Sequence, residues 1–387
     1  MKEPKIRFKG FSGEWKETTL ANVGKCFSGI GFPETEQGRK KGIPFYKVSD
    51  MNNIGNEKVM SNSNNYVTEE QVNKNGWKVC NDVPAIYFAK VGAAVLLNRK
   101  RLVLKPCLCD NNTMLYSFDK KVWDTYFCQS YFETIDLSSL VQVGSLPSYN
   151  ASMVGEVNVS LPDIDEQKAL GAYFQHLDSL IQSTTKKIES LKQVKAASLQ
   201  SMFPQEGETT PRVRFKGFEE EWEKVKIQDI CSKANSTHSE NSLGENIGNY
   251  PIFGANGYLQ NITTFDFSFP YIGIIKDGSG VGRSQLYPAF SSILGTMQYI
   301  LPKGDINISF LAYLFETIDF SMYINGSSIP HIYFKDYCEQ DEYIPSIAEQ
   351  RAIASYFTTL DRQITLQNQR LEKLKQIKAA CLDKMFV

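Results

Sequence analysis

The sequence predicts an α/β (α+β) protein with a pseudo-twofold internal repeat, in which two globular domains are separated by two long antiparallel coiled-coil helices. Residues 161–203 reappear 183 positions later at 344–386, with 20 identities in 43 positions and no gap. PKIRFKGFSGEW at 4–15 returns as PRVRFKGFEEEW at 211–222. The blocks between the repeated segments differ and carry short strand-like runs. Such self-similarity at a fixed spacing indicates the architecture of the whole chain.

The repeat divides the chain into four parts. We expect a first domain over 1–160, a central helix over 161–204, a linker and second domain over 205–343, and a C-terminal helix over 344–387. A shorter echo precedes each helix by the same distance: Gly144, Ser145, Leu146 and Pro147 correspond to Ser327, Ser328, Ile329 and Pro330. A scaffold kept twice with changed domains suggests one task performed at two different places.

Each repeated segment predicts a helix of about 38 residues, since apolar residues recur at alternating steps of three and four. An acidic first turn after a proline is typical of a helix start. Thr184 and Gln367 are polar at the same seam position, which favours a fixed antiparallel register. Leu180, Val194 and Ile377 widen the apolar face. The apolar seam residues are Leu177, Ile181, Ile188, Leu191, Met202, Leu360, Ile364, Leu371, Leu374 and Met385. The alternative is a pair of ordinary core helices.

The composition fits a cytoplasmic protein without a metal site. The eight cysteines are scattered without a CxxC pair, the three histidines lie far apart, and we expect neither a signal peptide nor a membrane span. Residues 20–160 carry 15 basic and 13 acidic side chains, whereas 223–343 carry 7 and 13. Any nucleic-acid contact must therefore come from local patches.

The first block offers polar and basic side chains next to strand-like runs. Asn and Arg pair with adenine and guanine edges, and Lys and Arg neutralise phosphate. The alternative is a solvated turn. The candidates are Lys47, Ser49, Asn98, Arg99, Lys100, Arg101, Asn111 and Asn112.

The second block interleaves aromatic residues with glycines, and two cations flank the loop GSGVG at 278–282. Glycines allow close approach of a ligand to the backbone, but the spacing matches no nucleotide-binding motif, and a plain turn remains open. The candidates are Tyr250, Asn256, Lys276, Ser279 and Arg283.

A catalytic reading of PDIDEQK at 162–168 is not supported. This string resembles the acidic site of nucleases, but the second copy reads PSIAEQR. The residues that both copies keep are those of a shared helix start. The chain also has no Pro-Pro dipeptide, which an adenine methyltransferase motif would contain.

Taken together, these motifs resemble the DNA-specificity subunit of type I restriction–modification systems over essentially the whole chain. The resemblance rests on RFKGF-x3-W at 7–15 and 214–222, on the GSLP and SSIP steps, and on P-x-I-x-E-Q before each helix. GIPFYKVSDM, NRK with DNN downstream, and YPIFGANG also look like segments of the family's recognition domains.

The resemblance implies a non-catalytic subunit whose two target recognition domains read the halves of a bipartite double-stranded DNA site. Two methyltransferase subunits and restriction subunits would be its partners. This chain would bind no cofactor, since S-adenosylmethionine would belong to the methyltransferase and ATP and Mg to the restriction subunit. We expect the second domain's DNA face to be locally basic near Lys276 and Arg283. The unlike blocks imply an asymmetric target.

Two other functions remain open. One is a bipartite nuclease or methyltransferase that acts on its own. The other is a coiled-coil scaffold with two heads that bind proteins and not DNA.

Overall fold

The computed structural model describes residues 3–141, 146–326 and 328–387. Gly144, Ser145 and Ser327 of the short echo lie outside these residues. Contacts divide the chain into two units, residues 1–184 with 370–387, and residues 185–369. Each unit therefore contains one variable block, the beginning of one long helix and the end of the other.

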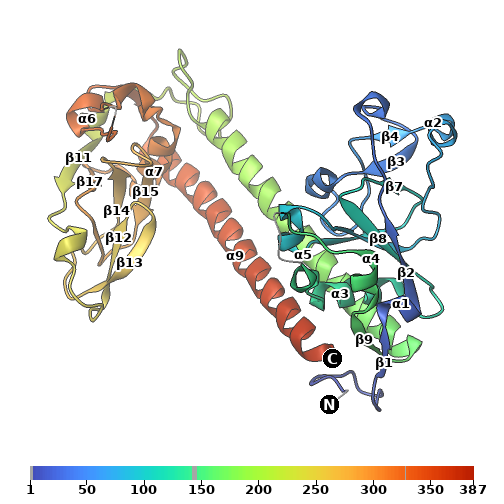
Figure 1. Ribbon diagram of the computed structural model, residues 1–387. Coiled ribbons are helices and arrows are strands. Elements are labelled where there is room, and N and C mark those ends of the chain that lie inside the picture. The colour runs from blue at the N-terminus through green and yellow to red at the C-terminus, as the bar shows by residue number, and fades with distance from the viewer. Residues whose placement is uncertain (1–2, 142–145, 327) are drawn as a thin grey trace. The chain divides into compact units, whose positions relative to one another are not determined.

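The first unit is built in layers around a four-stranded antiparallel sheet, ordered β2–β8–β5–β6 (Figure 1). Its strands are β2 (Gly24–Ser28), β8 (Thr113–Phe118), β5 (Ala85–Ala89) and β6 (Lys100–Val103). Every residue of β5 and β8 is buried. Because successive side chains point to opposite faces, Ile86 and Phe88 enter one core while Tyr87 enters another.

Two further small sheets and four short helices complete the first unit around this sheet. A three-stranded mixed sheet, β4 (Tyr66–Val67), β3 (Ile43–Tyr46) and β7 (Leu108–Cys109), completes the variable block, and β1 (Lys16–Thr19) pairs with β9 (Asn158–Leu161). The short helices are α1 (Leu20–Val23), α2 (Glu69–Lys74), α3 (Thr125–Thr134) and α4 (Ala151–Gly155). Helix α3 begins where the Asp124 carboxylate accepts the N–H groups of Tyr126 and Phe127 at 3.0 and 2.9 Å.

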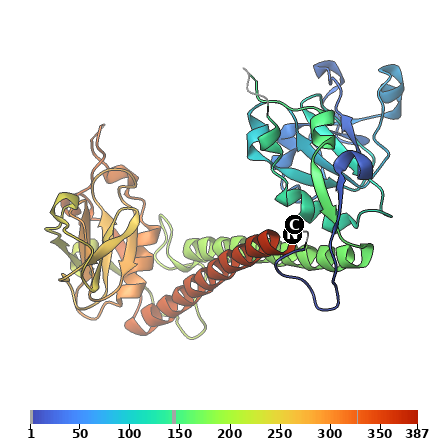
Figure 2. The ribbon, with the colours of Figure 1, turned by 60° about the horizontal axis from the view of Figure 1, so that its bottom comes forward.

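The second unit repeats this topology strand for strand. Figure 2 shows its strands, in yellow to orange, from another side. Its four-stranded sheet is β11 (Cys231–Asn235), β17 (Met297–Pro302), β14 (Tyr271–Ile275) and β15 (Ser284–Tyr287). The three-stranded sheet is β13 (Gly257–Ile262), β12 (Tyr250–Gly254) and β16 (Ser292–Ile293), and β10 (Glu223–Lys226) pairs with β18 (Asp341–Ile344). The helices are α6 (Ile227–Ile230), α7 (Ile308–Thr317) and α8 (Phe334–Tyr337). Two blocks without obvious sequence similarity therefore share one fold.

The repeated helix starts attach each domain to its helix through the same bonds. In the first unit Arg7 makes two bonds of 2.7 Å to Glu166, and Gln167 accepts the Asp124 N–H at 2.9 Å. In the second unit Arg214 bonds to Glu349 at 2.9 and 2.7 Å, and Gln350 accepts the Asn307 N–H at 3.0 Å. Glu and Gln at these positions thus have structural partners in both copies.

The two long helices are α5 (Ile164–Met202) and α9 (Ile347–Met385), each of 39 residues. In the first unit Phe386, after the end of α9, packs on Trp15, Phe127 and Phe174. In the second unit Phe203, after α5, packs on Trp222, Phe310 and Phe357. Since each unit joins the start of one helix to the end of the other, the antiparallel prediction is confirmed.

The seam residues are buried or half-buried, but two residues predicted to widen the seam are not. Val194 is 46% exposed and Ile377 is 38% exposed, so that prediction is wrong for both. They occupy the same position in the two copies, outside the three-four spacing of the seam. The hydroxyl of Thr184 donates to the Leu180 carbonyl of its own helix at 2.7 Å.

Candidate nucleic-acid interface

Backbone hydrogen bonds bring several loops of the first unit to one edge. The Asp110 N–H donates to the Tyr46 carbonyl at 2.9 Å, and the Lys90 N–H donates to the Asn112 carbonyl at 2.8 Å. The Tyr149 N–H donates to the Lys90 carbonyl at 3.2 Å. We call this the loop edge of the first unit: residues 47–49, 90–92, 110–112 and 146–148.

The second unit builds the same edge with the same bonds. The Leu294 N–H donates to the Phe253 carbonyl at 2.9 Å, and the Lys276 N–H donates to the Thr296 carbonyl at 3.0 Å. The Ile332 N–H donates to the Lys276 carbonyl at 2.8 Å. The loop edge of the second unit consists of residues 255–256, 276–283, 294–296 and 329–331.

Four of the predicted side chains of the first block lie on its loop edge. Ser49, Asn111 and Asn112 are exposed. Lys47 is half-buried, and its ammonium group donates to the Gln37 side chain at 3.3 Å. Two amides, a hydroxyl and a cation on one edge can donate to and accept from base edges and can contact phosphate.

The predicted DNA-binding side chains from Asn98 to Arg101 make hydrogen bonds within the domain. Asn98, at φ 49°, donates to the Ile135 carbonyl at 3.2 Å and accepts the Leu137 N–H at 3.0 Å. The ammonium group of Lys100 donates to the same Ile135 carbonyl, and burial lowers its pKa to about 8. Arg99 bonds to Asn52 at 2.7 Å. Burial also lowers the pKa of Arg101, whose guanidinium donates to the Lys100 carbonyl at 2.9 Å.

The predicted residues of the second block separate into two groups. Asn256, Ser279 and Arg283 are exposed on the loop edge, and the Arg283 guanidinium donates to the Ala255 carbonyl beside Asn256. Lys276 lies on the same edge, 3.6 Å from Asp277. Tyr250 does not, because it begins β12 whereas Asn256 follows the end of that strand, and its ring packs on Phe265 at 4.8 Å.

The acidic side chains of the second block are partly accounted for away from the loop edge. Asp341 pairs with Lys224 at 2.8 Å and Glu339 pairs with Lys226 at 2.8 Å, on and beside the two-stranded sheet β10–β18. These two acids are thus neutralised by lysines of the same sheet, whereas Asp277 lies on the loop edge beside Lys276.

Sequence reasoning missed Lys90, which is the structural equivalent of Lys276. Each lysine follows a buried strand and precedes a glycine at positive φ, Gly92 at 85° and Gly278 at 88°. Neither glycine has an atom within 4 Å of an added Cβ, so the space beside both is open. The sequence shows the shared pattern as KVG at 90–92 and KDG at 276–278, in each case a lysine two residues before a glycine.

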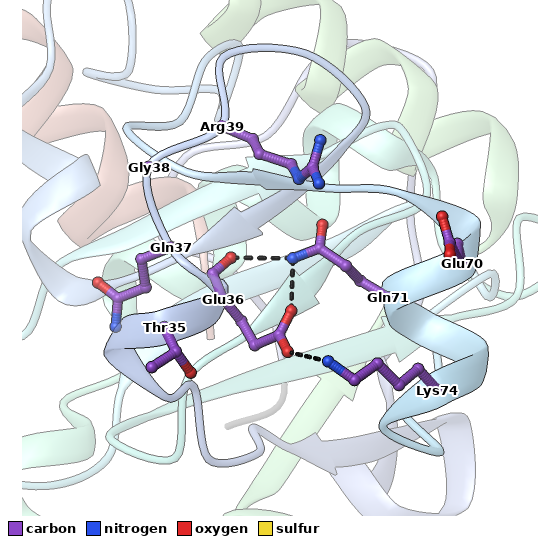
Figure 3. A pocket seen from close by; sticks show the side chains of 8 residues that line it. All are labelled: Thr35, Glu36, Gln37, Gly38, Arg39, Glu70, Gln71 and Lys74. Carbon is purple, nitrogen blue, oxygen red and sulfur yellow. Dashed lines mark hydrogen bonds and ion pairs between the residues drawn. The ribbon is translucent and has the colours of Figure 1, made fainter.

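A polar cavity of about 570 Å³ in the first unit does not carry a catalytic arrangement (Figure 3). The Glu36 carboxylate accepts from Gln71 at 2.6 Å and from Lys74 at 3.0 Å, and these bonds lower its pKa. The carboxylate is therefore held as an ion by neighbours that face it.

Among the described residues no cluster of three His, Cys, Asp or Glu side chains suits a metal ion. Within the same residues, no helix has the length and apolar character that crossing a membrane requires.

Comparisons with known proteins agree with the two-part construction. A model of the type I restriction modification DNA specificity domain matches residues 12–193 and again 219–376. A putative type I specificity subunit of Mycoplasma pneumoniae is 25% identical over 231 residues, which span 57% of this chain and 58% of that relative.

Two solved structures have a similar fold. The S subunit of a type I restriction–modification system from M. genitalium has a TM-score of 0.70 and 15% identity, over 100% of this chain and 99% of that one. A second structure concerns complex assembly and conformational transition of the type I R-M system. It has a TM-score of 0.52 and 15% identity, over 96% of this chain and 97% of that one. Since the family model matches both halves, this chain belongs to the type I restriction–modification DNA specificity family.

Proposed function

We propose that this chain is the sequence-reading subunit of a type I restriction–modification complex and recognises an asymmetric bipartite site in double-stranded DNA. The observation that carries the proposal is that two units of one topology present different side chains on the same loop edge. The first edge offers Asn111 and Asn112, and the second offers Asn256 and Arg283. Each unit would read one half-site, and the halves would differ.

The chemistry of these edges suits DNA. Asn side chains can make two bonds to adenine and Arg two bonds to guanine, whereas Lys90 and Lys276 can neutralise phosphate. The long helices would keep the half-sites apart, because 39 residues span about 58 Å at 1.5 Å per residue.

The reaction itself would belong to partner subunits. Two methyltransferase subunits, with S-adenosylmethionine, would methylate adenine, and restriction subunits, with ATP and Mg, would cleave. This chain would bind no cofactor and would catalyse no step. The assembly would work in the cytoplasm, where its cysteines would remain thiols.

The two other functions are less well supported. An enzyme that acts alone needs a catalytic cluster, and Glu166, the acid of the nuclease-like string, is bound by Arg7. A scaffold that binds only proteins gives no reason for the polar loop edges in both units.

Selection of bound duplexes from a random DNA pool tests the proposal, with the chain alone and with a methyltransferase subunit. We expect enrichment of two unlike short sequences at a fixed spacing. Lys90→Ala and Lys276→Ala should each weaken binding, whereas the control Lys224→Ala, an exposed lysine on β10, should not. Binding without sequence preference in both conditions would contradict the proposal, as would DNA turnover by the isolated chain.

A further inference from the structure

One large apolar side chain protrudes from each loop edge at the same position of the repeat. Leu146 is 56% exposed and Ile329, 183 residues later, is 66% exposed. A proline follows each of them. Exposing a large aliphatic side chain forgoes the stabilisation of burial, so its occurrence at equivalent positions of two otherwise different domains points to a shared use.

Backbone hydrogen bonds and buried side chains anchor the residues that follow Leu146 and Ile329. The Pro147 carbonyl accepts the Gly92 N–H at 2.8 Å, and the Pro330 carbonyl accepts the Gly278 N–H at 2.8 Å. Two residues further along the chain, Tyr149 is 5% exposed and Ile332 is 1% exposed, so both are anchored in the core. The chain that follows each of the two side chains is therefore anchored to the domain.

The neighbourhood of these side chains is polar and cationic. The Tyr149 N–H donates to the Lys90 carbonyl, and the Ile332 N–H donates to the Lys276 carbonyl, so each apolar residue shares its loop edge with a lysine whose backbone is bonded three residues further along. A single aliphatic side chain beside a phosphate-binding cation suits a base step better than the broad apolar area of a protein interface. Other exposed aliphatic residues, such as Leu97 at 60% and Ile54 at 92%, lie outside the loop edges.

We propose that Leu146 and Ile329 are wedges that insert between stacked bases, one in each half-site, and open the stack there. This inference rests on the proposed function. A base that is modified must leave the duplex, and an apolar wedge lowers the cost of doing so by occupying the opened step. Lys90 and Lys276 would hold the adjacent phosphates while the wedge enters.

The test uses the full chain and a duplex that contains the selected target, with 2-aminopurine placed at successive positions of either half-site. The wild-type chain should raise the fluorescence several-fold at one step in each half, because unstacking relieves the quenching of 2-aminopurine. Leu146→Ala should abolish the rise in one half only, and Ile329→Ala in the other half only. Leu97→Ala and Ile54→Ala are matched controls and should leave both signals unchanged.

A second measurement separates a wedge from a merely structural residue. A mismatch at the wedged step removes part of the unstacking cost, so the wild-type chain should prefer the mismatched duplex by roughly tenfold. Leu146→Ala should lose this preference while its circular dichroism spectrum stays that of the wild type. Unchanged fluorescence and unchanged preference in both alanine variants would overturn the wedge. Failure of the wild-type chain to select any sequence would instead overturn the proposed function.

Discussion

Lys195 and Lys378 occupy the same position in the two repeats, and each binds two carboxylates. Lys378 lies 2.7 Å from both Glu133 and Asp178, with 8% of its side chain exposed. Lys195 lies 3.0 Å from Glu316 and 2.9 Å from Asp361. In each unit the lysine comes from one long helix, the Asp from the other, and the Glu from α3 or α7. These junctions join each domain to both helices.

Replacing Lys378 with Met should therefore destabilise the first unit strongly. Removing one member of a buried ion pair costs about 3–5 kcal/mol, because the carboxylates lose one of their two counter-charges. The remaining Lys58, 2.6 Å from Glu133, should bring the loss toward the lower end of this range. Urea unfolding measures the change in the transition of that unit. Lys375→Met, at an exposed position of the same helix, is the control, and an equal effect of both substitutions would refute the role of the junction.

The two junction glutamates should titrate in opposite directions. Burial opposes the charge of both, but two lysines outweigh it at Glu133 and lower that pKa, whereas burial prevails at Glu316 and raises its pKa. Glu133 thus contributes stability above about pH 4.5 that is lost as the pH falls through its folded pKa. Glu316 makes the opposite contribution to the pH dependence of stability. Because folding raises its pKa, the stability that it contributes below the unfolded pKa is lost as the pH rises through its folded pKa. Carboxyl NMR titration should show that Lys58→Met raises the pKa of Glu133 and leaves that of Glu316 unchanged; an unmoved Glu133 would contradict the assignment.

The contacts of Lys90 and Lys100 predict different effects on DNA binding. Lys90→Ala should reduce the salt dependence of binding by about one unit of slope, which one lost phosphate contact gives. Lys100→Met should leave that slope unchanged, because its ammonium group is directed to the Ile135 carbonyl. Measuring affinity across a salt series decides between them, and a larger slope change for Lys100 would reverse the assignment.

At the scale of elements, strongly periodic segments were predictable and non-local pairing was not. The repeat and its seam predicted helices over 161–204 and 344–387, and the structure has α5 at Ile164–Met202 and α9 at Ile347–Met385. The strand order β2–β8–β5–β6 joins segments far apart in sequence, whose register no local pattern contains. For the same reason Asn98 and Lys100 were read as free side chains, since their shared partner, the Ile135 carbonyl, lies more than 30 residues away.

Lengthening both helices at the boundaries between the units should lengthen the gap between half-sites. Four residues added after Thr184 and four after Gln369 extend each helix by about 6 Å and turn it about 40° beyond a full turn. Both junctions remain intact within their units. At about 3.4 Å per base pair, the unread gap should grow by one to two base pairs.

Two added residues in each helix would instead turn the seam about 160° away and should abolish assembly. Selection of bound duplexes reads out the spacing of each variant. An active four-residue variant with an unaltered gap would mean that the helices hold the protein together without measuring DNA.

At the scale of the whole molecule, the chain carries one fold twice and varies the side chains at the two loop edges. Family membership followed from short motifs that hold the domains to the helices, such as Arg7 with Glu166 and Arg214 with Glu349. The half-site sequences do not follow from them, because under the proposed function bases would be read by loop side chains such as Asn112 and Arg283, whose pairing partners would be in the DNA.

Mapping adenine methylation in cells that carry this chain with methyltransferase subunits tests whether the two units read two separate half-sites. We expect a motif of two unlike parts separated by a gap of fixed length and unspecified sequence. We also expect that Asn112→Ala relaxes positions in one part and leaves the other unchanged. A palindromic motif, a continuous motif without a gap, or relaxation of both parts by that single substitution would contradict this expectation.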